Sequence, residues 1–226
     1  MKANEIHDLD SVQQVSNMKY IDNYYSRTKS VQVASASLDE KLSAEVCVIG
    51  GGLAGVSTAL GLAERGRSAV LLEANQIGWG ASGRNGGFVA SGFSQNPLVL
   101  IEKLGLAHAK QLYTLTQKAY ELIQLRVKDV EAEIKSPIQG TVTASWFNDS
   151  DGLQDYIHTM NTEFGESFEY WSKEKINDVY LTSRYHCGYL EPDTSHFQSL
   201  NYALHTADMA SNAGARIFEQ SPVTKV

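Results

Sequence analysis

Disulfides, long apolar runs and basic clusters are scarce or absent in this 226-residue sequence. Two cysteines, Cys47 and Cys187, are too few for a disulfide framework, which indicates a reducing compartment. No stretch of about 20 apolar residues occurs, so we expect no membrane-spanning helix, and the first residues lack the apolar core of a signal peptide. A net charge of −7 without a basic block argues against binding to nucleic acid or a membrane surface. These absences predict a soluble, cytoplasmic protein.

A glycine-rich step follows the first apolar run of the sequence, which covers about residues 44–49 and includes Cys47, expected to be buried. The step is G-x-G-x-x-G, formed by Gly50, Gly52 and Gly55, and a small-residue helix is expected over about residues 53–65. Gly50 allows a tight turn, Gly52 lets the backbone approach a pyrophosphate, and Gly55 lets the helix pack close to the strand. The pattern predicts a strand, a turn and a helix whose N-terminus faces a diphosphate.

An acidic residue, Glu73, closes the second apolar run, expected as a strand over residues 69–73. It lies about 20 residues past Gly52, where a carboxylate can bind the hydroxyls of a ribose. Strand, turn, helix, second strand and acid together predict dinucleotide binding. The alternative is a glycine-rich turn between strand and helix with an accidental glutamate.

The segment after the second strand is a glycine-rich loop in place of the usual second helix. Long loops of this kind are functional or disordered, and apolar neighbours such as Trp79 and Phe88 argue against disorder. We therefore expect an ordered segment that runs close to a ligand. Its glycines are Gly78, Gly80, Gly83, Gly86, Gly87 and Gly92.

The rest of the chain alternates helices with short strands. Helices are expected over about 97–104, 106–133, 153–164, 172–179 and 195–213, and strands over 141–147, 188–190 and 215–219. The last strand returns to the first sheet, so three parallel strands are expected before the sequence stops abruptly. The predicted domains are an N-terminal arm (1–43), a cofactor-binding domain (44–96 and 195–226, incomplete) and a helical portion of a substrate domain (97–194, incomplete).

Residues from about 20 to 226 resemble the amino-terminal half of the D-amino-acid-oxidase-like family of FAD-dependent oxidoreductases, nearest to its gamma-glutamylputrescine oxidase branch. The resemblance rests on the segments 47–55, 71–74, 77–87 and 214–223, and the Ala-Ser-Gly-Arg-Asn-Gly-Gly loop at 81–87 is its most specific part. It implies an α/β fold: a Rossmann-like FAD-binding domain with a parallel sheet, plus part of an α+β substrate domain, truncated at the C-terminus.

The resemblance also implies FAD rather than NAD as the cofactor and assigns residues to it. Arg84 is expected to serve the flavin or the phosphates, with a surface ion pair as the alternative. For the diphosphate the resemblance assigns the turn glycines Gly50, Gly52 and Gly55 with Leu53 and Ala54. For the adenosine it assigns Glu73 and Ala74 to the ribose and Val223 to the adenine. For the ribityl chain and flavin it assigns Gly80, Ala81, Ser82, Asn85, Gly86 and Gly87.

The implied chemistry is oxidation of a C–N bond in an amine or amino acid, with a gamma-glutamylputrescine-like substrate. Hydride passes to flavin N5, the imine hydrolyses, and oxygen reoxidises the flavin. No catalytic residue is assigned, and dependence on a missing C-terminal portion is expected. Two alternatives remain: a truncated, non-catalytic FAD-binding remnant, and an NAD(P)-linked Rossmann enzyme.

Several further side chains admit two interpretations each. His196, expected on the helix after residue 195, either serves the substrate or is a capping or surface histidine. Glu191 and Asp193 either attract an ammonium group or form a turn and helix cap. No metal site is predicted, because no further ligands stand at metal spacing from His186 and Cys187. Five aromatic residues form either an amine pocket or core: Trp146, Phe147, Phe168, Tyr170 and Trp171.

Overall fold

The computed structural model describes residues 19–33, 35–128 and 138–226. The chain divides into two compact units, one containing residues up to 86 together with 198–226, the other containing residues 87–197. The end of the helix expected over 106–133 falls outside the described residues. None of the described helices has the length and apolar character needed to cross a membrane.

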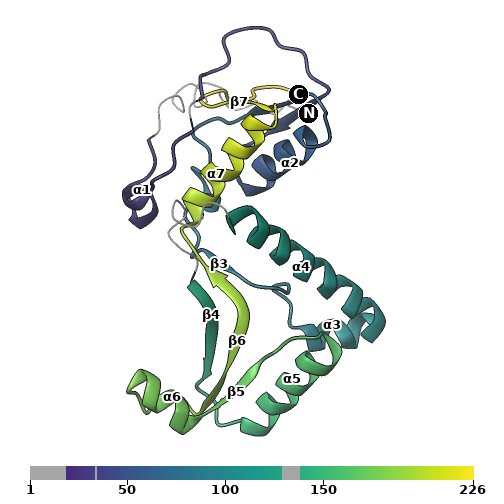
Figure 1. The fold of residues 1–226 in the computed structure, drawn as a ribbon, viewed down its shortest axis with the longest axis vertical. Helices are drawn as coiled ribbons and strands as arrows, with labels where there is room; N and C mark the ends of the chain where they lie inside the picture. Colours follow the sequence, from purple (N-terminus) through teal and green to yellow (C-terminus); the bar gives the residue numbers. More distant parts are fainter. Residues whose placement is uncertain (1–18, 34, 129–137) are drawn as a thin grey trace, which may run out of the picture. The chain divides into compact units, whose positions relative to one another are not determined.

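The first unit is built on a three-stranded parallel sheet, of which Figure 1 labels strand β7, next to helix α7. Its strands are β1 (Val46–Ile49), β2 (Ala69–Leu72) and β7 (Arg216–Phe218), in the order β1-β2-β7. Val46 pairs with Ala69, and Val70 pairs with Arg216. The expected return of the last strand to the first sheet is therefore confirmed, as is the α/β fold.

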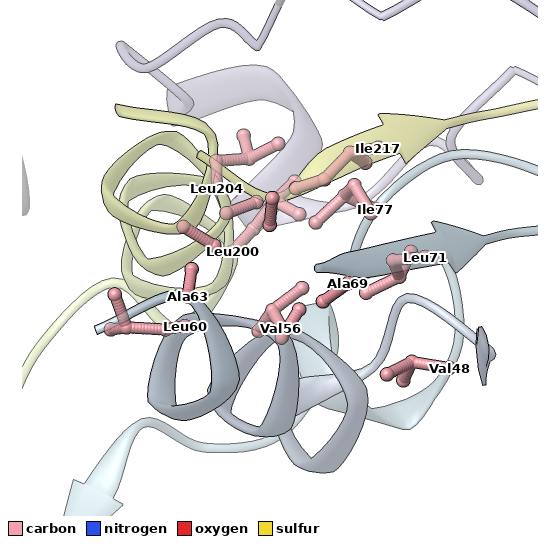
Figure 2. Packing of buried hydrophobic residues seen from close by; sticks show 14 residues of the cluster. Val48, Val56, Leu60, Ala63, Ala69, Leu71, Ile77, Leu200, Leu204 and Ile217 are labelled. Carbon is pink, nitrogen blue, oxygen red and sulfur yellow. The ribbon is translucent and has the colours of Figure 1, made fainter. Parts of the chain in front are cut away.

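Two helices, α2 (Leu53–Ala63) and α7 (Ser199–Asn212), cover one face of this sheet. Figure 2 shows side chains of both helices packed next to those of β2 and β7. This side of the sheet holds the main apolar core of the unit, and burial of such side chains is the chief stabilising contribution. Its members include Val56, Leu60, Ala63, Ala69, Leu71, Ile77, Leu200, Leu204 and Ile217.

The expectation that Cys47 is buried is wrong. Successive side chains of a strand point to opposite faces, and on β1 Val48 faces the core while Cys47 and Ile49 are exposed. The short apolar run predicted the strand but did not indicate which face of the sheet is exposed.

The described residues of the second unit form an antiparallel sheet and four helices. The long strand β6 (Cys187–His196) pairs with β4 (Ile138–Ser145) and with two shorter strands, β3 (Phe88–Val89) and β5 (Glu169–Ser172). Tyr113, Met160 and Phe164 lie in its core. The helices are α3 (Pro97–Leu104), α4 (Leu106–Val127), α5 (Ser150–Glu163) and α6 (Lys173–Tyr180).

The boundary expected between strand 188–190 and a helix from residue 195 is wrong. Strand β6 continues to His196, and α7 begins only at Ser199, after its cap Gln198. Ser195 and His196 pair with residues of β3 and β4. The pairing of β4 with β6 is interrupted around Pro192 by a shift of register between Gln139 and Thr141. A proline without a backbone donor is tolerated at such an irregularity. Consequently Glu191, Asp193 and His196 are strand residues rather than turn or helix residues.

Substitutions of two glycines in α2 test the close packing of this helix. A Cβ added to Gly55 would lie closer than 3.0 Å to the Gly50 carbonyl oxygen, a backbone atom that cannot move freely. We expect Gly55→Ala to lower the free energy of unfolding by about 3 kcal/mol, measured by denaturant titration. Gly61→Ala, in the same helix, meets only the flexible end of Arg65 and should be neutral or raise it by about 0.5 kcal/mol. Equal effects of both substitutions would contradict this packing.

Candidate functional site

The turn between β1 and α2 is built from three consecutive glycines. Gly50 has a φ of +100° and donates its N–H to the carbonyl oxygen of Leu72 at 2.8 Å, which fixes the end of β1 against β2. Gly52 is the N-cap of α2, with a φ of −75°. Behind it, Gly55 leaves the space that the Gly50 carbonyl oxygen occupies. The strand therefore leads into the helix through these three glycines alone. The first N–H groups of the helix point out of the turn.

A side-chain oxygen atom of this chain lies at the N-terminus of α2. The Leu53 N–H donates to Ser82 Oγ at 2.9 Å, and a Cβ added to Gly52 would lie 3.0 Å from the same oxygen. The N-terminus of a helix carries a partial positive charge and free donors, which suits the oxygens of a phosphate group. The arrangement shows that an acceptor oxygen fits at this point and that a side chain at residue 52 would crowd it. These residues therefore fit a diphosphate.

Glu73 lies beside the same turn, as its position after β2 predicted. Its two carboxylate oxygens accept hydrogen bonds from the backbone N–H groups of Gly51 (2.6 Å) and Asn75 (2.7 Å). The carboxylate is thus held in place by the backbone on both sides. A fixed acceptor next to the helix N-terminus is the arrangement that binds ribose hydroxyls beside a diphosphate.

The glycine-rich loop is ordered and folds back on itself. It contains the short 3-10 helix η3 (Ala81–Gly83), and the Asn85 side chain donates to the carbonyl oxygen of Ser82 at 2.9 Å. Arg84 is exposed, donates to the carbonyl oxygen of Gly80 at 3.1 Å, and lies 5.2 Å from the centre of the Trp79 ring. Internal hydrogen bonds and the close packing of Gly83 on Leu200 hold the loop, whereas Phe88, one of the aromatic residues on which the expectation of order rested, is 71% exposed.

The remaining sequence-predicted residues lie in two places. Val223 follows Ser221, whose N–H donates to the carbonyl oxygen of Glu73 at 2.8 Å, so the last residues of the chain pass close to Glu73 and Ala74. Gly87 belongs to the second unit, where its carbonyl oxygen accepts from the Phe197 N–H at 3.1 Å. The first unit therefore brings together the turn, Glu73 and the loop up to Gly86.

Two residues of this site, Tyr20 and Glu219, were missed by the sequence analysis. Both bind the backbone of Ile77: its N–H donates to Glu219 Oε1 at 2.6 Å, and its carbonyl oxygen accepts from the Tyr20 hydroxyl at 2.7 Å. Glu219 follows β7 as Glu73 follows β2, and carboxyl ends of parallel strands share one sheet edge. That shared edge was the signal that could have identified Glu219; the sequence holds no comparable signal for Tyr20.

Burial shifts the ionisation of both groups. It raises the pKa of Glu219, with the nearby Glu73 charge acting in the same direction. Burial also raises the pKa of Tyr20, and the charges of Glu219 and Glu73 add to the effect. The Tyr20 hydroxyl therefore stays protonated and keeps donating to Ile77.

The candidate residues of the second unit have mixed positions. The His196 ring packs against Phe88 at 4.8 Å between ring centres. Phe168 is buried and stacks on Tyr189, as the core interpretation predicts, whereas Trp146 is exposed. Phe147 is exposed too, and Tyr170 packs beside the buried aromatic cluster.

Carboxylates gather around a pocket of about 320 Å³ in this unit, lined in part by Glu121, Glu166 and Asp193. Burial raises the pKa of nearby Glu191, which accepts a hydrogen bond from Thr143 at 3.3 Å. The charge of the pocket suits a cationic group. Among the described residues, no three His, Cys, Asp or Glu side chains lie close enough to hold a metal ion.

Comparison with known proteins agrees with this geometry. The family model described as FAD dependent oxidoreductase matches residues 45–226. Gamma-glutamylputrescine oxidoreductase of Escherichia coli is 29% identical over 208 residues, covering 92% of this chain and 49% of its own length. This chain thus spans about half the length of the curated relatives it matches.

Solved structures share the fold at lower identity. Glycine oxidase from Bacillus cereus superposes with a TM-score of 0.59 at 21% identity, over 81% of this chain and 48% of its own. L-alpha-glycerophosphate oxidase from Mycoplasma pneumoniae, solved with FAD bound, gives a TM-score of 0.61 at 15% identity, over 82% and 47%. These two proteins oxidise different kinds of compound, so the shared fold leaves the substrate open.

The raised pKa of Glu219 predicts a pH-dependent stability. A carboxylate whose folded pKa is raised stabilises the fold below its ordinary value of 4.5 and loses this contribution as the pH rises through the folded pKa. Glu219→Gln removes the titration and keeps an acceptor for the Ile77 N–H. We expect the free energy of unfolding of this variant, relative to wild type, to increase between pH 4.5 and pH 7. Denaturant titrations across this pH range measure the free energy of unfolding of both proteins. Glu64→Gln, at an exposed residue, is the control for the loss of one charge. A difference between Glu219→Gln and wild type that does not change with pH would contradict the prediction.

Proposed function

This chain belongs to the family of FAD-dependent oxidoreductases, and from that premise we propose that it binds the ADP half of FAD in an enzyme that oxidises a C–N bond of an amine or amino acid. The observation that carries the proposal is the oxygen acceptor held on the Leu53 N–H, beside the fixed carboxylate of Glu73. It supports a diphosphate at the helix N-terminus and a ribose on the carboxylate.

The proposed roles of the other residues follow the path of the chain. Ala54 and the turn glycines serve the diphosphate with Leu53, while Ala74 and Val223 serve the adenosine. When bound, FAD supplies the acceptor for the two electrons that leave the C–N bond. The protein contributes binding, orientation and a fixed backbone, and we assign no catalytic residue. The loop residues proposed to line the ribityl chain and flavin are Gly80, Ala81, Ser82, Arg84, Asn85, Gly86 and Gly87.

The proposed substrate is an amine of the gamma-glutamylputrescine kind. The support is the E. coli relative, whose name states that compound, and the acidic pocket of the second unit suits an ammonium group. Oxygen as the final electron acceptor, a cytoplasmic location and dependence on a further C-terminal portion belong to the same proposal.

Two alternatives make different predictions. A non-catalytic remnant would hold FAD weakly or not at all and would never pass electrons to it. An NAD(P)-linked enzyme would bind a nicotinamide cofactor without flavin absorbance. The glycine-rich loop in place of a second helix favours FAD over both nicotinamide cofactors.

Gly52→Ala tests the cofactor site directly. Its φ of −75° suits alanine, and the added methyl group meets only the movable Ser82 hydroxyl, so the fold should survive. The methyl group occupies the space where the backbone approaches the diphosphate. We expect FAD affinity, measured by fluorescence titration, to fall at least about tenfold. Gly61→Ala, on the same helix, is the control and should bind FAD as wild type does; equal affinity of both variants would reject the assigned site.

Anaerobic mixing with an amine tests the reaction. FAD-loaded protein, as this chain and extended to the length of its relatives, is mixed with gamma-glutamylputrescine and followed by visible absorbance. Loss of the oxidised flavin absorbance is expected, and admission of oxygen should restore it. A flavin in the extended protein that no amine ever reduces would contradict the proposed reaction and favour the remnant.

A further inference from the structure

The N-terminal arm is bound to the first unit by buried polar side chains. Residues 19–33 precede the range matched by the family model and contain the short helix α1 (Tyr24–Thr28). Gln198, at the start of α7, donates to the carbonyl oxygen of Tyr25 at 2.7 Å, and Tyr25 itself packs against the main core. The alignment with the E. coli relative covers 92% of the chain and therefore extends into this arm.

Asn201 shows that the arm is part of the folded unit. Its side chain is fully buried, accepts a hydrogen bond from the Ser30 N–H at 3.0 Å, and donates to the Ser30 hydroxyl at 3.0 Å. Without the arm, a buried amide would lose these partners, at a considerable cost in free energy. The sequence of α7 thus requires an arm in this position.

Lys19 and Tyr20, the first described residues of the arm, contact the residues that open the glycine-rich loop. The Tyr20 hydroxyl donates to the Ile77 carbonyl oxygen at 2.7 Å, and the Trp79 indole N–H donates to the Lys19 carbonyl oxygen at 3.2 Å. The Lys29 ammonium lies 5.8 Å from the centre of the Tyr20 ring. Ile77 and Trp79, the residues on either side of Gly78, are therefore both hydrogen-bonded to the arm.

Ile77 connects the two parts of the proposed FAD site. Its side chain is fully buried, and a Cβ added to Gly51 would lie 2.5 Å from its Cδ1 atom, so it packs directly on the glycine turn. The next residue, Gly78, donates its N–H to the carbonyl oxygen of Gly51 at 2.9 Å. A displacement of the Ile77 backbone would therefore move the turn and the loop relative to each other.

We propose that Tyr20 is a positioning residue for the cofactor: by holding the Ile77 carbonyl oxygen, the arm keeps the loop from Gly78 to Gly86 in its binding conformation before FAD arrives. The proposal rests on the proposed function for the identity of the ligand, while its effect on the loop exists without the ligand. Preorganisation of this kind raises affinity because less ordering remains to be done on binding.

Tyr20→Phe removes the hydroxyl and retains the ring, so it isolates this hydrogen bond. Two quantities are measured on the 226-residue chain: hydrogen exchange of the amides in 78–86 without FAD, and the Kd for FAD. We expect exchange in the loop to accelerate about fivefold while amides of α2 stay unchanged, and the Kd to rise about fivefold, as the loss of one partly buried hydrogen bond implies.

Two further variants serve as controls for Tyr20→Phe. Tyr24→Phe removes the hydroxyl of a tyrosine in the same arm whose side chain is 66% exposed, and it should leave both quantities unchanged. Leu204→Ala, in the main core, should accelerate exchange throughout the unit, which is the signature of a merely structural effect.

The proposal is overturned if Tyr20→Phe behaves as Tyr24→Phe in loop exchange, or if it accelerates exchange throughout the unit as Leu204→Ala does. Failure of the wild-type chain to bind FAD would count against the proposed function alone, because loop exchange without FAD still decides the role of Tyr20.

Discussion

The close approach of α2 to the end of β1 determines most of what this chain can do. The Gly50 carbonyl oxygen occupies the space where residue 55 would place a side chain, so only glycine permits the helix to start immediately after the strand. That position leaves the Leu53 N–H at the surface of the turn and brings Gly51 within 2.6 Å of the Glu73 carboxylate. One steric constraint thus sets the distance between the proposed site for phosphate oxygens and the proposed site for ribose hydroxyls.

The site is made mainly of backbone, and side chains distant in sequence hold that backbone. Ile77 illustrates the principle: Glu219 binds its N–H, Tyr20 binds its carbonyl oxygen, and its own side chain packs on the turn. Glu219 is partly buried near the carboxylate of Glu73, and both effects raise its pKa. The charged Glu219 carboxylate therefore costs folding free energy at neutral pH, which is common where a structure is arranged for binding rather than for maximal stability.

Local patterns predicted the first unit well and the second less well. The β1–turn–α2–β2 unit follows from glycine spacing and hydrophobic period, which act within a few residues. By contrast, the extension of β6 to His196 depends on partners on β3 and β4, and the exposure of Cys47 depends on which sheet face is covered. The contact of Tyr20 with Ile77 joins residues 57 positions apart. No local pattern encodes such pairings, so the sequence could suggest residues proposed to touch the cofactor but not the residues proposed to position them.

The central claim is that this chain binds the ADP half of FAD, and competition between nucleotides tests it most directly. FAD is first bound to the 226-residue chain, and ADP or FMN is then added in excess while the free flavin is measured by fluorescence. We expect ADP to displace FAD, because both are proposed to use the helix N-terminus and Glu73. FMN, which lacks the adenosine half, should displace FAD far less. Displacement by FMN with no effect of ADP would contradict binding of the ADP half at this site.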